Sequence, residues 1–202
     1  MSSPTVVFHD KSAEALLAAD PTITVVGFET FGFTEGPVWC PNISSWIFSD
    51  IPKATQYKYE VGTSSLSVYR QPSNNSNGNI LDAAGNLISC EHRGRCVSMT
   101  DLLTGEYTVL ATEFGGKRLT SPNDVIVSQK DGSIWFTDPA YGTMAMLGHG
   151  EPSEQPVNCV YRLDTSTGAL TAVATRAANS RGTGGPTGPL GTPSRTPRAT
   201  LS

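Results

Sequence analysis

The chain has 202 residues, of which 38% are hydrophobic and 16% charged, so it can bury the core of a globular domain. The formal net charge is −4, but residues 176–202 hold four arginines and no acid. The remainder therefore has 10 basic and 18 acidic residues, a net charge of −8. An acidic body repels phosphate backbones, which argues against a nucleic-acid partner. No apolar run of about 18 residues and no leader pattern is present, so we expect a cytoplasmic protein without a membrane partner.

Residues 1–21 are predicted to form an N-terminal segment, in which residues 12–19 (SAEALLAA) make a short helix. From residue 22 the chain changes to short β-forming runs that are broken by Gly, Pro, Asn and Asp. Long helical periodicity is absent beyond that point. We therefore expect an all-β domain over residues 22–175, which begins with a first strand at residues 22–28.

Three short apolar strands each end in an acidic residue. WIFSD, LISCE and IWFTD occupy residues 46–50, 87–91 and 134–138, so their terminal acids are 41 and 47 residues apart. Each strand is followed by a hairpin-like segment whose turn contains a glycine, at Gly62, Gly105 and Gly168. This recurring unit indicates the four-stranded blades of a β-propeller, because an α/β sheet would need helices between its strands.

The third repeat is longer than the second. The extra residues predict an insertion at about residues 139–158, which we expect to overhang one face of the propeller. Trp39, Trp46 and Trp135 are most simply interpreted as core residues between blades. Residues 176–202 are built from Gly, Pro, Thr, Ser, Arg and Ala with two leucines, and this composition predicts a disordered tail.

Six sequence motifs resemble the gluconolactonase and regucalcin-like family, which includes senescence marker protein and luciferin-regenerating enzyme. They are FTEGPVW (33–39), WIFSDIP (46–52), NGNILDAAGNL (77–87), CEHRGR (90–95), SPNDV (121–125) and DGSIWFTDPAYG (131–142). The resemblance covers residues 22–175, the N-terminal half of such a protein. It implies a six-bladed β-propeller, here truncated to about three blades, with a divalent ion in its central pocket.

The resemblance also assigns residues to that ion. Glu35 matches a glutamate that binds the metal, and Asn123 matches an asparagine that binds the metal or the substrate. The implied metal is Ca²⁺, with Zn²⁺, Mg²⁺ and Mn²⁺ as alternatives, and carboxylate and amide oxygens are the ligands that Ca²⁺ prefers. Without the resemblance, Glu35 could be a surface acid and Asn123 a turn former. The family's later ligands have no counterpart here, so the metal site is expected to be incomplete.

Asp138 and His92 are the candidates for a general base that activates water for attack on a lactone carbonyl. Asp138 could instead cap a turn, and His92 could be a surface histidine. Arg118 is a candidate for binding the carboxylate of a sugar acid, or else a solvated loop charge.

Two classes of function remain open from the sequence. One is a calcium-dependent hydrolase that opens a sugar lactone, or a related ester, and is impaired by truncation. The other is a non-enzymatic propeller fragment that binds or regulates a partner. Three repeats do not close a ring, so we also expect self-association through open blade edges.

Overall fold

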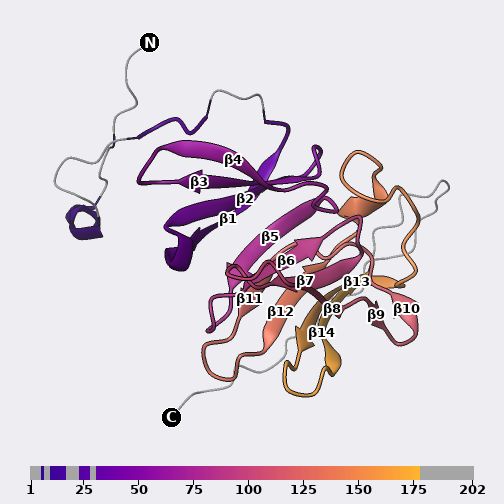
Figure 1. The fold of residues 1–202 in the computed structure, drawn as a ribbon. Helices are drawn as coiled ribbons and strands as arrows, with labels where there is room; N and C mark the ends of the chain where they lie inside the picture. Colours follow the sequence, from indigo (N-terminus) through magenta and orange to yellow (C-terminus); the bar gives the residue numbers. More distant parts are fainter. Residues whose placement is uncertain (1–5, 7–9, 17–22, 28–30, 178–202) are drawn as a thin grey trace.

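The computed structural model describes residues 6, 10–16, 23–27 and 31–177 (Figure 1). The described chain is built from antiparallel sheets with three short 3-10 helices. Three of the sheets have four strands each, which follow one another in chain order from one edge of the sheet to the other. They are the blades of a β-propeller, as the repeat predicts.

The strand bounds of the three blades are as follows. Blade 1 contains β1 (Thr34–Cys40), β2 (Ser45–Asp50), β3 (Thr55–Glu60) and β4 (Ser65–Arg70). Blade 2 contains β5 (Ser76–Leu81), β6 (Leu87–Glu91), β7 (Cys96–Thr100) and β8 (Tyr107–Ala111). Blade 3 contains β11 (Val125–Val127), β12 (Ile134–Asp138), β13 (Val157–Leu163) and β14 (Leu170–Ala177).

Short elements connect the blades and precede them. The hairpin of β9 (Glu113–Phe114) and β10 (Lys117–Arg118) lies between blades 2 and 3, and the 3-10 helices are η1 (Lys11–Leu16), η2 (Pro41–Ile43) and η3 (Tyr141–Thr143). The predicted N-terminal helix is thus a 3-10 helix in its described part. No helix in the described ranges is long and apolar enough to cross a bilayer.

The predicted first strand at residues 22–28 is wrong in its described part, because residues 23–27 pair with no sheet. The tail is predicted to begin at residue 176, but β14 continues through residues 176 and 177. Residues 178–202, on which the rest of that prediction falls, lie outside the described residues.

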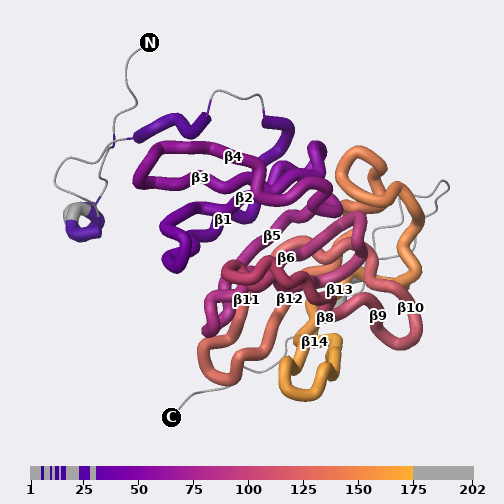
Figure 2. The backbone as a smooth tube through the Cα atoms, in the orientation of Figure 1, coloured from indigo at the N-terminus to yellow at the C-terminus, as the bar shows by residue number. Residues whose placement is uncertain are grey.

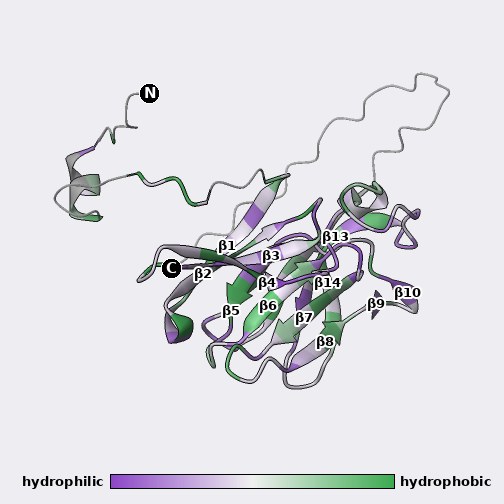
Figure 3. Cartoon of the chain, turned by 45° about the horizontal axis from the view of Figure 1, so that its top comes forward, coloured by the Kyte–Doolittle hydropathy of each residue, from purple (hydrophilic) through white to green (hydrophobic). Residues whose placement is uncertain are grey.

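The blades stack face to face in chain order, and their first strands β1, β5 and β11 are neighbours (Figure 2). Blades 2 and 3 bury an apolar core that includes Ile88, Val97, Phe136 and Tyr161. Figure 3 shows the corresponding hydrophobic segments on the strands of blade 2. A smaller apolar cluster around Ile47 joins blade 1 to blade 2.

Much of the interface between blades 1 and 2 is polar, with Asn79 at its centre. The Asn79 amide N–H₂ donates to the Gly36 carbonyl at 2.9 Å and the Ser49 hydroxyl at 2.9 Å. Its oxygen accepts hydrogen bonds from Gln56 at 2.8 Å and Ser89 at 2.7 Å. Because Asn79 is only 7% exposed, water cannot readily replace these partners.

We expect Asn79→Ala to lower the free energy of unfolding by about 3 kcal/mol, because it leaves several buried polar groups without partners. Urea unfolding followed by tryptophan fluorescence measures the change. The matched control is Asn42→Ala at an exposed turn, which should change stability by less than about 0.5 kcal/mol. Equal effects of the two substitutions would show that the polar interface adds no stability.

Candidate active site

A cavity of about 640 Å³ opens where the first strands of the three blades meet. Its lining combines polar and apolar side chains from all three blades and from the connection between β12 and β13, residues 139–156. The lining residues are Phe33, Glu35, Gly36, Pro37, Ile51, Asn77, Gly78, Asn79, His92, Asn123, Asp124, Tyr141 and Leu147. Glu35 and Asn123, the two metal ligands implied by the sequence, therefore share one cavity.

Each blade contributes one polar residue to this cavity from a position that agrees between the repeats to within one residue. Glu35, Asn77 and Asn123 precede the terminal acids of their blades by 15, 14 and 15 residues. Gly78, next to Asn77, donates its N–H to the Asn123 carbonyl at 2.8 Å and so ties the first strand of blade 2 to blade 3. The polar residues thus meet because the repeat brings equivalent positions to a common axis.

His92 lies behind the two asparagines. Its Nε2 atom is 3.3 Å from the Asn77 amide nitrogen and 3.2 Å from the Asn123 amide nitrogen, and its Nδ1 atom is 2.9 Å from the Leu147 carbonyl oxygen. A carbonyl oxygen only accepts, so Nδ1 carries a proton. Burial lowers the pKa of His92, although the Leu147 carbonyl acts against this. A neutral ring then leaves Nε2 as the acceptor for the amides.

These contacts leave oxygen atoms available toward the cavity. With their nitrogens on His92, the amide oxygens of Asn77 and Asn123 accept no hydrogen bond from any described residue. The Glu35 carboxylate is exposed and has no hydrogen bond or ion pair within the described ranges. This set of hard oxygen donors fits a divalent cation such as Ca²⁺, although Ca²⁺ takes six to eight ligands. No cluster of three or more His, Cys, Asp or Glu residues that could hold a metal occurs in the described chain, this cavity included.

Asp138 does not line the cavity. It is fully buried, and its two oxygens accept hydrogen bonds from the backbone N–H groups of Thr120 at 2.9 Å and Ser121 at 2.7 Å. Asp50, its equivalent in blade 1, accepts in the same way from Gly32 and Phe33. The carboxylates of Asp50 and Asp138 thus hold the segment that leads into their own blade. This arrangement corresponds to the alternative in which Asp138 caps a turn.

Arg118 also lies away from the cavity. It is exposed on β10, and its backbone N–H donates to the Glu154 carboxylate at 3.0 Å. A buried arginine, Arg95, instead holds the 139–156 connection in place through ion pairs with Glu154 at 3.1 Å and Glu151 at 3.5 Å. Its guanidinium also donates to the Leu119 carbonyl at 2.7 Å. The connection is thereby held against the cavity, where Tyr141 and Leu147 form part of the wall.

Sequence reasoning missed Asn77 and the apolar wall of Phe33, Tyr141 and Leu147. A signal for Asn77 was present, because aligning the repeats on their terminal acids places it within one residue of Glu35 and Asn123. The apolar wall had no comparable signal. Leu147 reaches the cavity only through the path of a long connection, which no local pattern specifies.

The fold and site define a propeller protein with polar residues gathered at the axis of its blades. Residues 33–184 match the family described as SMP-30/Gluconolactonase/LRE-like region, and the chain belongs to this family. A gluconolactonase from Zymomonas mobilis is 29% identical over an alignment of 163 residues, and the match covers 74% of this chain and 45% of the relative. The chain therefore spans less than half the length of that relative.

Solved structures give the same relationship. A gluconolactonase from Xanthomonas campestris is 32% identical with a TM-score of 0.68, over 72% of this chain and 48% of the relative. Regucalcin from Agrobacterium tumefaciens, a calcium-binding protein, is 16% identical with a TM-score of 0.53, over 75% of this chain and 46% of the relative. At that identity the regucalcin match shows a shared fold alone.

Burial raises the pKa of Asp138 to about 6, although its two backbone donors favour the charged form. A pKa that is higher in the folded chain than in the unfolded one stabilises the fold at low pH, and this contribution is lost as pH rises through 6. We therefore expect the stability of the native chain relative to Asp138→Asn to fall between pH 4 and 7, by at most about 3 kcal/mol. Unfolding free energies across this range measure it.

Asp131→Asn is the matched control. Hydrogen bonds from Ser133 lower the pKa of Asp131, so its contribution to stability is lost only as pH falls below the range tested. If the stability of the native chain relative to Asp138→Asn instead rises with pH, the backbone hydrogen bonds lower the pKa of Asp138 more than burial raises it.

Proposed function

We propose that this chain carries one side of a divalent-metal site that serves to open lactone rings by hydrolysis. The observation that carries the proposal is that Glu35, Asn77 and Asn123 line one cavity, with side-chain oxygens that accept no hydrogen bond from the described residues. Membership of the gluconolactonase family supports a lactone substrate. Ca²⁺ is the proposed ion because all three side chains offer hard oxygens.

When bound, such an ion polarises a carbonyl oxygen and lowers the pKa of a bound water. The residues of this chain supply the rest of the site. Glu35 provides a negative charge, while Asn123 offers its amide oxygen to the cation or to the substrate. His92 keeps both amides oriented, and its Nε2 atom is the proposed acceptor of a proton from water when an amide N–H turns away.

We propose roles for Asp138 and Arg118 that differ from those expected from the sequence. The Asp138 carboxylate is satisfied by two backbone donors outside the cavity lining, so we propose that it positions Thr120 and Ser121, shortly before Asn123. Arg118 is exposed on β10 and is not among the residues that line the cavity. The substrate pocket is instead polar at its base and apolar along Phe33, Tyr141 and Leu147.

Three side-chain ligands fall short of the six to eight oxygens that Ca²⁺ prefers. We therefore expect weak lactonase activity, or none, from the isolated monomer. A robust rate from purified monomer that EDTA abolishes would contradict this expectation. Hydrolysis of a sugar lactone, an aliphatic lactone and a simple ester, each with and without EDTA, makes the measurement and compares substrate classes.

Calcium binding tests the site independently of turnover. We expect Glu35→Gln to weaken Ca²⁺ binding by about 10-fold or more in calorimetric titration, because it removes the formal negative charge among the three proposed ligands. Glu113→Gln, at an exposed position on β9 outside the cavity, is the matched control and should bind as the native chain does. Identical affinities of the native chain and both variants would remove Glu35 from the metal site.

A further inference from the structure

The two outermost blade faces of the described chain are apolar and carry no further sheet. In the second strand of each blade, the position of a residue before the terminal acid determines which neighbouring blade its side chain faces. The third and first residues before the acid face the next blade, as Ile47 and Ser49 do in blade 1. The fourth and second residues before it face the preceding blade, as Ile134 and Phe136 do in blade 3.

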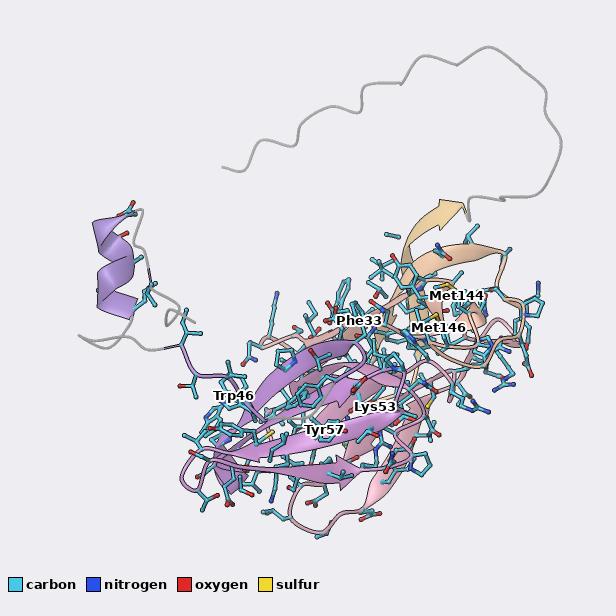
Figure 4. The ribbon with its side chains drawn as sticks, turned by 90° about the horizontal axis from the view of Figure 1, so that it is seen from above. Phe33, Trp46, Lys53, Tyr57, Met144 and Met146 are labelled. Carbon is cyan, nitrogen blue, oxygen red and sulfur yellow. The ribbon has the colours of Figure 1, made fainter. Side chains whose placement is uncertain are left out.

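By the same count, Trp46 and Phe48 of blade 1 point toward a preceding blade, and Trp135 and Thr137 of blade 3 point toward a following one. Neither neighbouring blade exists among the described residues. The prediction that the tryptophans lie between blades is therefore wrong for Trp39 and Trp46, which are 39% and 42% exposed. Figure 4 shows Trp46 at the opposite end of the molecule from Met144 and Met146, which belong to blade 3's long connection.

Each outer face has a hollow at its centre. On blade 1 the hollow is about 300 Å³ and is lined by Val26, Pro37, Trp46, Phe48 and Tyr59. On blade 3 it is about 190 Å³, and its lining includes Ile126, Trp135, Thr137 and Val160. On the face of blade 1, Phe31 packs edge-on against Phe48, but Trp46 remains accessible. On the face of blade 3, Ile126 is 62% exposed. Aromatic side chains in an apolar hollow are typical of the centre of a protein interface.

We propose that two copies of this chain assemble head to tail, with the outer face of blade 3 in each copy packed on the outer face of blade 1 in the other. The two buried interfaces within the chain join the same two kinds of face, so the missing contact repeats a geometry that the protein already uses. A head-to-tail contact forms a closed ring when its rotation closes. Three blades match about half of a related propeller, so two copies complete the ring.

The assembly would place a second Glu35, Asn77 and Asn123 across the same axis. Two copies would thus provide six polar side chains at the centre, where a single copy provides three. The dimer depends only on the blade faces, so it can hold or fail independently of the proposed lactonase chemistry. Measuring it in the presence of EDTA separates the two proposals.

Analytical ultracentrifugation of the full 202-residue chain in EDTA tests the assembly. The native chain should sediment as a species of twice 21.4 kDa. Trp46→Lys and Ile126→Asp should each raise the dimer dissociation constant by about 100-fold or more, because a closed dimer loses the contact twice. Leu103→Lys is the control, since Leu103 is 77% exposed in the turn between β7 and β8, away from both faces, and should leave the dimer intact.

Mixing the two variants distinguishes head-to-tail pairing from other dimers. Equal amounts of Trp46→Lys and Ile126→Asp should recover a dimer, because one interface is then native and the other joins the two introduced, opposite charges. Circular dichroism of each variant checks that it remains folded. A monomeric native chain, open oligomers that grow with concentration, or a mixture that stays monomeric while both variants are folded would each overturn the proposal.

Discussion

The first strands of the three blades approach so closely that a methyl group does not fit at Gly36 or Gly78. A Cβ atom on Gly36 would collide with the Asn77 carbonyl oxygen, and one on Gly78 would lie 2.8 Å from the Asn123 carbonyl oxygen. Gly36 also adopts a φ of 57°, a conformation that side chains disfavour. The residue beside each glycine, Glu35 or Asn77, is thereby held at the edge of the cavity. The same constraint sets both the stacking of the blades and the composition of the candidate site.

The two internal interfaces use different chemistry to hold that arrangement. Blades 2 and 3 are joined by a continuous apolar core, whose burial drives their packing without fixing it in detail. Blades 1 and 2 rely on Asn79 and on the partly buried ion pair of Arg70 with Glu91, at 2.7 Å. Buried polar contacts give little net stability but tolerate few alternative registers. This interface therefore determines how blade 1 presents Glu35 to the other two blades.

The site and the outer faces are connected through the same geometry. Propeller blades place their polar inner ends on the axis, so a cation site there gains ligands with every blade that joins. In the described chain, the apolar faces of blades 1 and 3 lack neighbours while the axis holds three polar side chains. A blade that covers one of these apolar faces would therefore also add polar side chains at the axis. The pairing of two copies would do both.

The sequence by itself determined the blades, because a strand that ends in an acid, followed by a glycine-containing hairpin, is a local pattern that recurs along the chain. LISCE and IWFTD are strands with the predicted bounds, and the insertion after Asp138 is present. The sequence also identified Glu35 and Asn123 as residues of one pocket, through motifs that fold onto blades 1 and 3. It identified His92 only as a candidate base, with a surface histidine as the alternative that the sequence slightly favoured.

Only the tertiary structure decided which polar residues face that pocket. Asp138 and His92 were equivalent candidates from their residue types, but backbone N–H groups from a segment about 18 residues earlier occupy the Asp138 carboxylate, while His92 contacts Asn77 and Asn123. The exposure of Trp46 likewise depends on whether another blade covers it. Contacts between segments far apart in the chain decide these features, because a local pattern specifies a strand and its alternating faces but not what lies against them.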